Sequence, residues 1–237
     1  MNIIFLELSI FLLYNIIIFI LGCFMITFFQ ILFLFLAYLF GSIPFGLIIG
    51  LIKGIDIRKI GSKNIGSTNV GRALGKKYAV LTFILDMIKG ALFVVLFRYN
   101  IIDNKFMLLD PALYGFVAML GHSFPIFLKF KGGKAVATGA GFIFAYIPIS
   151  IPVGIISFLI IIKTLKISSV GSLLATFLTV LVGVIFTIIG YDPITSVPIK
   201  WYFIIFAILA LTLIYIKHIP NIKRLIKKEE LKPNKIA

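Results

Sequence analysis

The sequence contains few of the residues from which disulfides and metal sites are built. Its 237 residues include one cysteine, Cys23, two histidines, His122 and His218, and eight Asp and Glu residues. A single cysteine excludes a disulfide within the chain. Imidazole and carboxylate ligands this sparse make no convincing metal cluster, so we expect neither a metal nor another cofactor.

Charged residues are also scarce. They make up 13% of the chain, and 61% of it is hydrophobic, whereas ordinary soluble domains are about 25% charged. Apolar runs of about 18 or more residues recur, and each can cross the roughly 30 Å hydrocarbon core of a bilayer. We therefore expect an all-α, polytopic transmembrane helical bundle. Its apolar segments are 3–24, 28–52, 78–97, 108–127, 135–147, 149–162, 170–190 and 200–216.

The positive charge is concentrated between these segments. Of the 23 Lys and Arg residues, 17 lie in residues 53–77, in residues 128–134 or in the tail from Lys217 onward. The positive-inside rule places these three regions in the cytoplasm. Because the cations border membrane spans and lack an aromatic-rich polar domain, we expect membrane lipids rather than nucleic acid as partners.

Residues 163–169 also carry cations, Lys163 and Lys166, and the same rule places them in the cytoplasm. The stretch 135–162 then has both ends in the cytoplasm. Its 28 residues must enter the membrane and return, and Pro148 and Pro152 interrupt the helical pattern near the middle. Proline removes a backbone donor and breaks a helix. We expect a hairpin of two short or tilted helices, in which the small residues of "TGAGF" (138–142) allow close helix packing.

The first apolar segment differs from the others. Residues 3–24 carry Glu7, have no flanking cation and run almost directly into the next segment. Residues 1–25 could be an extra helix, a signal-like segment or the result of a misassigned start, with Met25 as the true first residue. We assign residues 26–237 to one membrane domain.

Residues 61–72, "GSKNIGSTNVGR", are polar in an otherwise apolar chain. Glycines let backbone amides approach a ligand closely, hydroxyl and amide side chains can bind oxygen atoms, and Arg72 offers a bidentate fork for phosphate. The alternative is a solvated loop that caps the helix starting near Lys77. Candidate ligand groups are Ser62, Asn64, Gly66, Thr68 and Asn69.

Two further segments favour the binding interpretation. "KGGK" (131–134) precedes an apolar helix, an arrangement in which amides, a helix N-terminus and two lysines can hold an anion. It lacks the P-loop spacing. "KHIPNIKRL" (217–225) adds His218 and Asn221 at the cytoplasmic end of a span, where a histidine alone would more often be an interfacial residue.

Inside a span, "LDMIKG" (85–90) puts Asp86 and Lys89 three residues apart on one helix face. A lone charge at mid-bilayer costs about 2.5–3.5 kcal/mol. These residues therefore form either a structural ion pair that joins helices or, with Lys89 near a polar cavity, part of an anion site.

Taken in order, "GSKNIGSTNVGR", "LDMIKG", "GHSFPIFLKFKGGKAVAT", "SSVGSL" and "KHIPNIKRLIKKEE" resemble the motifs of the bacterial acyl-phosphate-dependent glycerol-3-phosphate acyltransferases. The resemblance covers about residues 28–230. It implies a multi-pass protein of the bacterial inner membrane with seven transmembrane helices and its site on the cytoplasmic face, consistent with the seven apolar segments after residue 28. Residues 3–24 have no counterpart, so residues 26–237 would be the integral membrane acyltransferase domain.

The resemblance also implies roles for individual residues. Ser62 and Arg72 match positions needed for activity and glycerol-3-phosphate binding, and His218 and Asn221 match activity residues of the third motif. Glu230 matches an acidic residue with a structural role, which we also expect of Asp86 and Lys89. The expected substrate-binding residues are Asn64, Gly66, Thr68, Asn69, Lys131, Gly132, Gly133, Lys134 and Ser169.

The sequence departs from the family pattern at four positions. Ser67 stands where Ala is usual, Lys166 and Lys217 stand where Arg is usual, and Lys228 stands where Gly is usual. The last of these changes puts the register of Glu230 in doubt more than the chemistry.

The implied reaction moves an acyl chain from acyl phosphate to the 1-hydroxyl of glycerol-3-phosphate, giving lysophosphatidic acid and phosphate for phospholipid biosynthesis. Acyl phosphate has a good leaving group, so positioning and charge stabilisation should suffice, without a covalent Ser or Cys intermediate. The base would be His218 or the substrate's own phosphate. No His is followed by Asp with four residues between them, the HxxxxD pattern of soluble-type acyltransferases: Phe127 and Lys223 stand at the Asp position.

Two other functions remain open from the sequence. The first is a secondary transporter or channel for an organic or phosphorylated anion, although such proteins usually show internal repeats and broken helices near the bilayer midplane. The second is a non-catalytic lipid-binding membrane protein.

Overall fold

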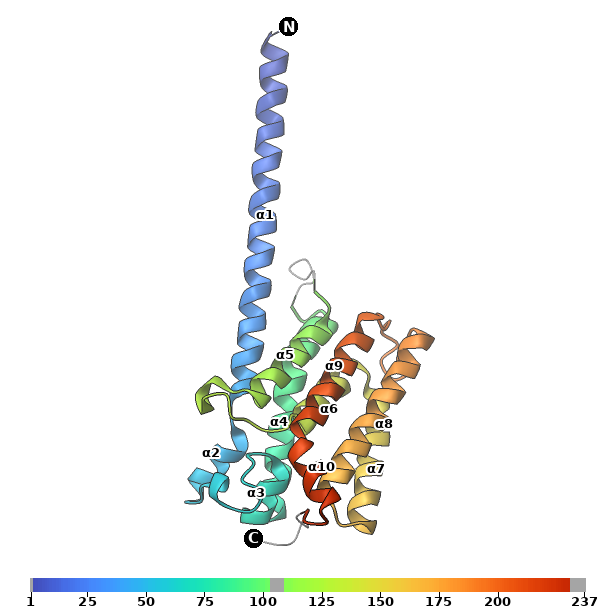
Figure 1. Ribbon diagram of the computed structural model, residues 1–237. Coiled ribbons are helices and arrows are strands. Elements are labelled where there is room, and N and C mark those ends of the chain that lie inside the picture. Colours follow the sequence, from blue (N-terminus) through green and yellow to red (C-terminus); the bar gives the residue numbers. More distant parts are fainter. Residues whose placement is uncertain (1, 103–108, 231–237) are drawn as a thin grey trace.

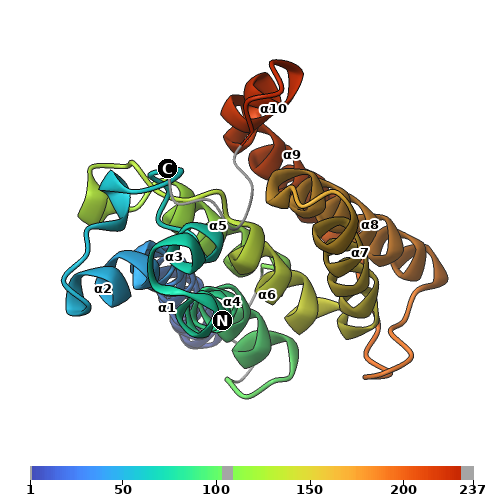
Figure 2. The same cartoon turned by 90° about the horizontal axis from the view of Figure 1, so that it is seen from below.

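A computed structural model describes residues 2–102 and 109–230, with side chains from residue 11 onward. The described residues form a bundle of helices, seen from the side in Figure 1 and from below in Figure 2. The long elements are α1 (Asn2–Ser42), α4 (Lys76–Arg98), α5 (Pro111–Ser123), α6 (Val136–Tyr146), α7 (Ile151–Thr164), α8 (Ser168–Ile189) and α9 (Tyr202–Lys217). Short helices are α2 (Phe45–Ile52), α3 (Ser67–Leu74) and α10 (Ile219–Ile226), with 3₁₀ turns η1 (Ile57–Lys59), η3 (Ile126–Leu128) and η4 (Pro148–Ser150).

The all-helical membrane architecture is confirmed. Within the described residues, four stretches are long and apolar enough to cross a bilayer, namely Phe11–Ile52, α4, Pro111–Leu128 and α8. α9 joins them if it is counted together with α10 across a 51° bend. α6 and α7 are apolar but shorter. The expected hairpin at 135–162 therefore exists as α6 and α7, joined at Pro148.

The chain before Ser42 is arranged differently from the sequence prediction. Segments 3–24 and 28–52 were expected to be separate, but α1 runs unbroken for 41 residues and the chain breaks at Ile43 and Pro44 instead. Proline cannot donate a backbone hydrogen bond and disfavours the helical conformation of the residue before it. The N-terminal part of α1 projects beyond the bundle (Figure 1), and the side chains of residues 11–25 are exposed.

The bundle core is held together by close helix contacts. α4 packs against α6, where a Cβ added at Gly90 would lie 1.9 Å from the Thr138 carbonyl oxygen and one at Gly141 would lie 1.9 Å from that of Met87. Small residues of 138–142 thus allow close packing, as predicted. α8 and α9 pack against each other and against α6. One buried cluster joins Phe142 of α6, Ile147 directly after α6 and Phe203 of α9.

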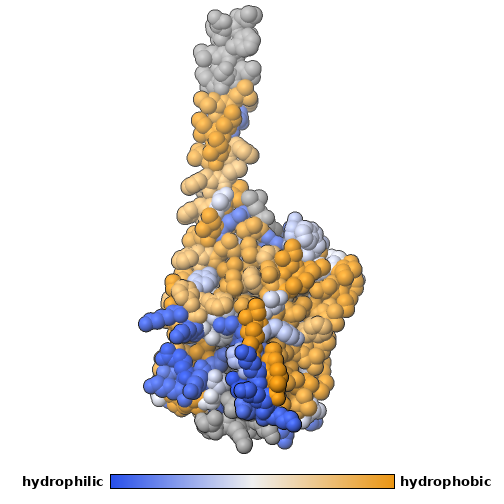
Figure 3. All heavy atoms as spheres, viewed as in Figure 1, coloured by the Kyte–Doolittle hydropathy of each residue, from blue (hydrophilic) through white to orange (hydrophobic). Residues whose placement is uncertain are grey.

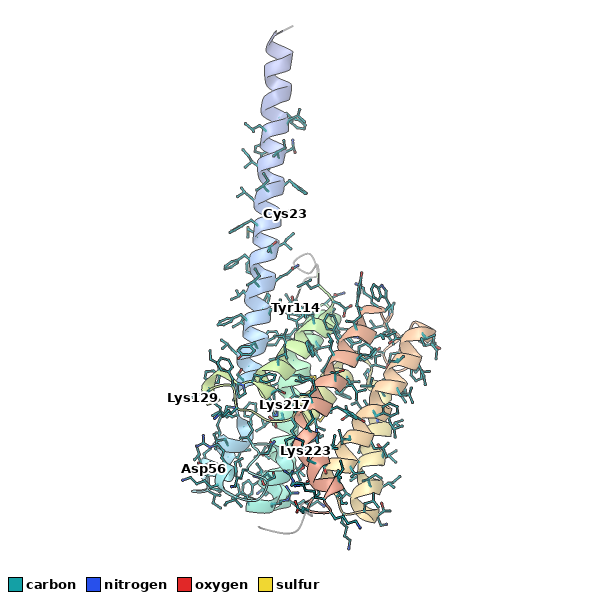
Figure 4. The ribbon with its side chains drawn as sticks, in the orientation of Figure 1. Cys23, Asp56, Tyr114, Lys129, Lys217 and Lys223 are labelled. Carbon is teal, nitrogen blue, oxygen red and sulfur yellow. The ribbon has the colours of Figure 1, made fainter. Side chains whose placement is uncertain are left out.

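The two ends of the bundle differ in polarity. Hydrophilic side chains gather at the lower end in Figure 3, and Figure 4 shows Lys129, Lys217, Lys223 and Asp56 in this half of the molecule. Above this end, hydrophobic side chains cover most of the visible bundle surface. The structure therefore brings the three cationic regions of the sequence to one end.

Candidate active site

A cavity of about 450 Å³ lies between α3, α4, α6, α7, α8 and the junction of α9 with α10. Its polar part is lined by residues from all three predicted motif regions. Of the predicted site residues, those that line it are Ser62, Asn64, Gly66, Thr68, Asn69, Arg72, Asp86, Lys134, Ser169, His218, Asn221 and Glu230.

The first motif is a loop that its own side chains hold against α3. The Asn69 side chain, 1% exposed, donates from Nδ2 to the carbonyl oxygens of Ile57 (2.9 Å) and Ile60 (3.0 Å) and accepts from the Ser62 amide (2.8 Å). Gly61 has a φ of 55°, and a Cβ there would lie 2.6 Å from Asn69 Oδ1. The predicted ligand group Asn69 therefore uses its hydrogen bonds to shape the loop.

Helix α3 begins directly at the cavity. Gly66 is its N-cap, and the Gly66 amide donates to Asn64 Oδ1 (2.9 Å). Ser67 and Thr68, in the first turn of α3, line the cavity. The first amides of a helix lack partners within the helix and carry a partial positive charge, so this turn presents a favourable environment for an anion.

Arg72 follows one turn later on the same helix. Its side chain is 8% exposed, and its Nη2 lies 3.5 Å from Ser168 Oγ at the start of α8. Burial lowers the pKa of Arg72, and the nearby Glu230 carboxylate opposes that shift. A guanidinium starts from a pKa above 12, so Arg72 keeps its charge.

A chain of polar side chains holds Lys134 on the opposite wall. Lys134 Nζ donates to Asn221 Oδ1, and Asn221 Nδ2 donates to Glu230 Oε1 (2.6 Å). Arg224 Nε donates to the other oxygen of Glu230 (2.7 Å). Burial lowers the pKa of Lys134 to about 8, with the Glu230 charge acting in the opposite direction. Lys134 is therefore a cation at neutral pH that can lose its proton at moderately alkaline pH.

His218 lies where α9 bends into α10. Its Nδ1 is 2.8 Å from the Ile214 carbonyl oxygen. A carbonyl only accepts hydrogen bonds, so Nδ1 carries the proton. In the neutral ring, Nε2 is then an acceptor, which is the state that a general base requires.

The "KGGK" segment is built differently from the sequence prediction. The Gly133 amide donates to the His122 carbonyl oxygen (3.0 Å), so it is engaged within the protein. A Cβ at Gly133 would lie 2.0 Å from His122 Nε2, and one at Gly132 would lie 2.1 Å from the His122 carbonyl oxygen. Lys131 is exposed, and Lys131, Gly132 and Gly133 are outside the set of described residues that line the cavity.

Behind the cavity wall, Asp86 and Lys89 are buried together. Lys89 Nζ lies 2.8 Å from Asp86 Oδ1 and donates to the Ile43 carbonyl oxygen (2.9 Å) at the break between α1 and α2. Asp86 Oδ1 is also 3.7 Å from His122 Nδ1. The pair thus joins α4 to both α1 and α5, and Asp86 itself reaches the cavity wall.

Six polar residues of the lining were not among the predicted site residues, namely Ser67, His122, Ser168, Ser172, Thr176 and Thr179. Ser67 and Ser168 each lie beside a predicted residue at a helix start, and His122 belongs to the second motif. Adjacent serines at the start of a helix were the available signal for Ser168. Among the described residues, no group of three or more His, Cys, Asp or Glu side chains could hold a metal ion.

The rest of the cavity is an apolar slot between α4, α6, α7 and α8. Small residues keep it open, including Ala137, Gly139, Ala140 and Ala175, and larger side chains such as Phe83 and Phe158 form its walls. Thr176 also lines it, but its hydroxyl donates to the Ser172 carbonyl oxygen (2.7 Å). One cavity thus joins a cationic mouth to an apolar slot.

Comparisons with known proteins point to one family. The profile described as glycerol-3-phosphate acyltransferase matches residues 31–228. A glycerol-3-phosphate acyltransferase 2 of Bacillus cereus is 40% identical over 189 residues, covering 79% of this chain and 87% of the relative. The glycerol-3-phosphate acyltransferase of an Anaeromyxobacter species is 38% identical over 182 residues, covering 77% and 86%.

Solved structures of PlsY, an integral membrane glycerol 3-phosphate acyltransferase, have a similar fold. The glycerol 3-phosphate form has a TM-score of 0.71 and the lysophosphatidic acid form one of 0.70. Both are 36% identical in sequence, and each comparison covers 85% of this chain and 94% of the PlsY chain.

Proposed function

The chain belongs to the glycerol-3-phosphate acyltransferase family, and from this premise we propose that it transfers an acyl chain from acyl phosphate to the 1-hydroxyl of glycerol-3-phosphate. The products are lysophosphatidic acid and inorganic phosphate. The protein is an integral membrane protein, and we place its cavity on the cytoplasmic face of a bacterial inner membrane because the cationic regions gather at that end. The reaction would supply phospholipid biosynthesis.

The observation that carries the proposal is the union of two environments in one cavity. Arg72, Lys134 and the first turn of α3 form a mouth suited to two phosphate groups, and the adjoining apolar slot suits an acyl chain. Both reactants bear phosphate, and the donor bears the chain. Holding them side by side supplies the proximity on which the reaction depends.

The arrangement favours direct transfer. The glycerol 1-hydroxyl attacks the acyl carbon, the bond to the phosphate oxygen breaks, and phosphate leaves with the electron pair. The hydroxyl proton passes to His218 Nε2 or to a phosphate oxygen of the substrate. Among the described residues, no serine hydroxyl is hydrogen-bonded to His218, so the site lacks the serine–histidine pair that activates a nucleophilic serine.

Individual roles follow from these positions. Arg72 and Lys134 would neutralise the phosphates, with Ser62, Thr68 and Ser169 as hydrogen-bonding partners. Asn221 would hold Lys134, and Glu230 would orient Asn221. Asn69 would shape the loop, while Lys131, Gly132 and Gly133 would act from outside the cavity in the conformation described.

A turnover assay tests the proposal. Detergent-solubilised full-length protein is given acyl phosphate and glycerol-3-phosphate, and lysophosphatidic acid and phosphate are measured. Formation of both in equal amounts supports acyl phosphate as donor. Acylation only with a thioester donor would contradict it. The absence of acylation, together with anion uptake by vesicles that contain the reconstituted protein, would favour the alternative of an anion transporter.

The fold does not favour the alternative function of an anion transporter. The deep end of the cavity abuts the buried cluster that includes Ile147 and Phe203. Alternating-access proteins place their site near the midplane between two repeats, whereas the cationic side chains of this cavity lie at one end of the bundle.

A further inference from the structure

The apolar slot has a measurable depth along α8. Ser169, Ser172, Thr176 and Thr179 recur every three or four residues and all line the cavity, so one face of α8 forms a wall of the slot. From Ser168 to Thr179 the helix rises about 16 Å at 1.5 Å per residue. This length is suited to a long acyl chain whose head group lies at the mouth.

The deep end of the slot is closed by the protein core. Ile143 and Ile151 line the slot, and they belong to the same buried cluster as Ile147, Val180 and Phe203. One turn beyond Thr179, a Cβ on Gly183 would lie 3.0 Å from Phe203 Cε1. The core therefore leaves no comparable space on this face of α8 beyond Thr179.

Gly154 of α7 faces Thr179 at this end. A Cβ at Gly154 would lie 2.1 Å from Thr179 Oγ1, and both residues line the cavity. Any side chain at position 154 must therefore displace Thr179. Because Thr179 lines the slot, bulk at position 154 changes the shape of the slot at this end.

We propose that Ile151, Gly154 and Thr179 determine the longest acyl chain that the enzyme uses efficiently. This inference rests on the proposed function, because it assigns the apolar slot to the acyl chain. A competing route exists at the side of the slot, where Val80, Ile155 and Leu159 line the cavity and are 49%, 47% and 58% exposed. An acyl chain that left the slot through this side would end in lipid, and its length would not be limited by the residues around Gly154.

Two variants change the depth in opposite directions. Gly154→Val fills the end, and Ile151→Ala enlarges it. Each buried methylene contributes about a fourfold change in binding, so loss of space for two methylenes should lower kcat/KM for the longest good donor about 15-fold. Short donors should keep wild-type values. Ile151→Ala should shift the preferred chain to a longer one.

Gly183→Ala is the matched control. This variant also adds a side chain at a buried glycine, here next to Phe203 of the buried cluster, but Gly183 is not part of the cavity lining. It should alter thermal stability without changing the chain-length profile.

The full-length protein is tested in detergent with a series of straight-chain acyl phosphates from short to long. A parallel series of 1-acylglycerol 3-phosphates is measured as ligands by thermal stabilisation, which does not depend on the donor. Shifts of the preferred acyl-chain length in opposite directions in Gly154→Val and Ile151→Ala support the proposal. If Gly154→Val does not fold, the shift in Ile151→Ala alone decides it. Unchanged profiles in both series would overturn it. Failure of acyl phosphate as donor, with product binding still dependent on chain length, would contradict only the proposed donor.

Discussion

Two glycine-containing cationic segments face the same cavity, but they contribute to it in different ways. In residues 61–72, the backbone and side chains of the loop and the first turn of α3 form the wall themselves. In residues 131–134, the glycines pack against His122 and only Lys134 reaches the cavity among these four residues. Segments of similar composition therefore differ in role: the first lines the cavity with its backbone and side chains, and the second provides close backbone packing.

The largest expected effect tests the first segment. Arg72→Ala removes a buried guanidinium that faces the mouth, and charge-assisted hydrogen bonds of this kind contribute about 1.5–3 kcal/mol. We expect kcat/KM for glycerol-3-phosphate to fall about 100-fold, measured as product formation by solubilised protein. Arg72→Lys should retain more of the wild-type kcat/KM than Arg72→Ala but not all of it, because lysine lacks the planar fork. Wild-type kinetics in Arg72→Ala would show that Arg72 does not bind glycerol-3-phosphate.

A matched pair of lysines tests the second segment. Lys134→Ala should lower kcat/KM about 30-fold, in line with loss of a hydrogen bond to a charged group. Lys131→Ala should stay within about threefold, because Lys131 is exposed and surface charges contribute little. Both variants remove the same charge from the same segment. The reverse order of effects would show that substrate binding moves Lys131 into the cavity.

The alkaline limb of the pH profile provides a third test. Lys134 has a pKa lowered to about 8 by burial, so its charge is present at pH 7 and is lost as the pH rises through that value. We expect KM for glycerol-3-phosphate to rise up to about tenfold between roughly pH 7 and pH 9. Lys134→Arg should flatten this rise, because arginine stays charged. A rise of equal size in that variant would assign the titration to another group.

The sequence predicted the membrane fold well because its signals are local. Hydrophobic length marks the apolar helices, the placement of lysine and arginine marks the end of the bundle where positive charge gathers, and Pro148 marks the hairpin of α6 and α7. The prediction of two separate segments, 3–24 and 28–52, was wrong for α1. No charged residue, glycine pair or proline between Gly22 and Gln30 ends the helix, so it continues through this region. The break occurs instead at Pro44, inside the apolar run 28–52.

The sequence predicted which side chains line the cavity where the residue type alone is the signal, as for Arg72, Lys134 and Asn221. The role of the second glycine pair could not be predicted, because it depends on α5 bringing His122 against Gly133. Asn69 illustrates the same limit. An amide that could bind substrate instead bonds to Ile57, Ile60 and Ser62, and this pairing exists only after the loop has folded.

The smallest expected effect on activity compares one glycine from each segment. A Cβ at Gly133 would lie 2.0 Å from His122 Nε2, whereas one at Gly66 would meet only Asn64 Oδ1, at 3.3 Å. Overpacking costs about 1–3 kcal/mol, so Gly133→Ala should lower thermal stability clearly and Gly66→Ala should not. Because Gly133 precedes Lys134, we also expect a few-fold rise in KM in Gly133→Ala. The stability of both variants is measured by thermal unfolding in one detergent. Equal stability would show that the backbone at Gly133, like that at Gly66, has room for a side chain, and that the two segments do not differ in packing.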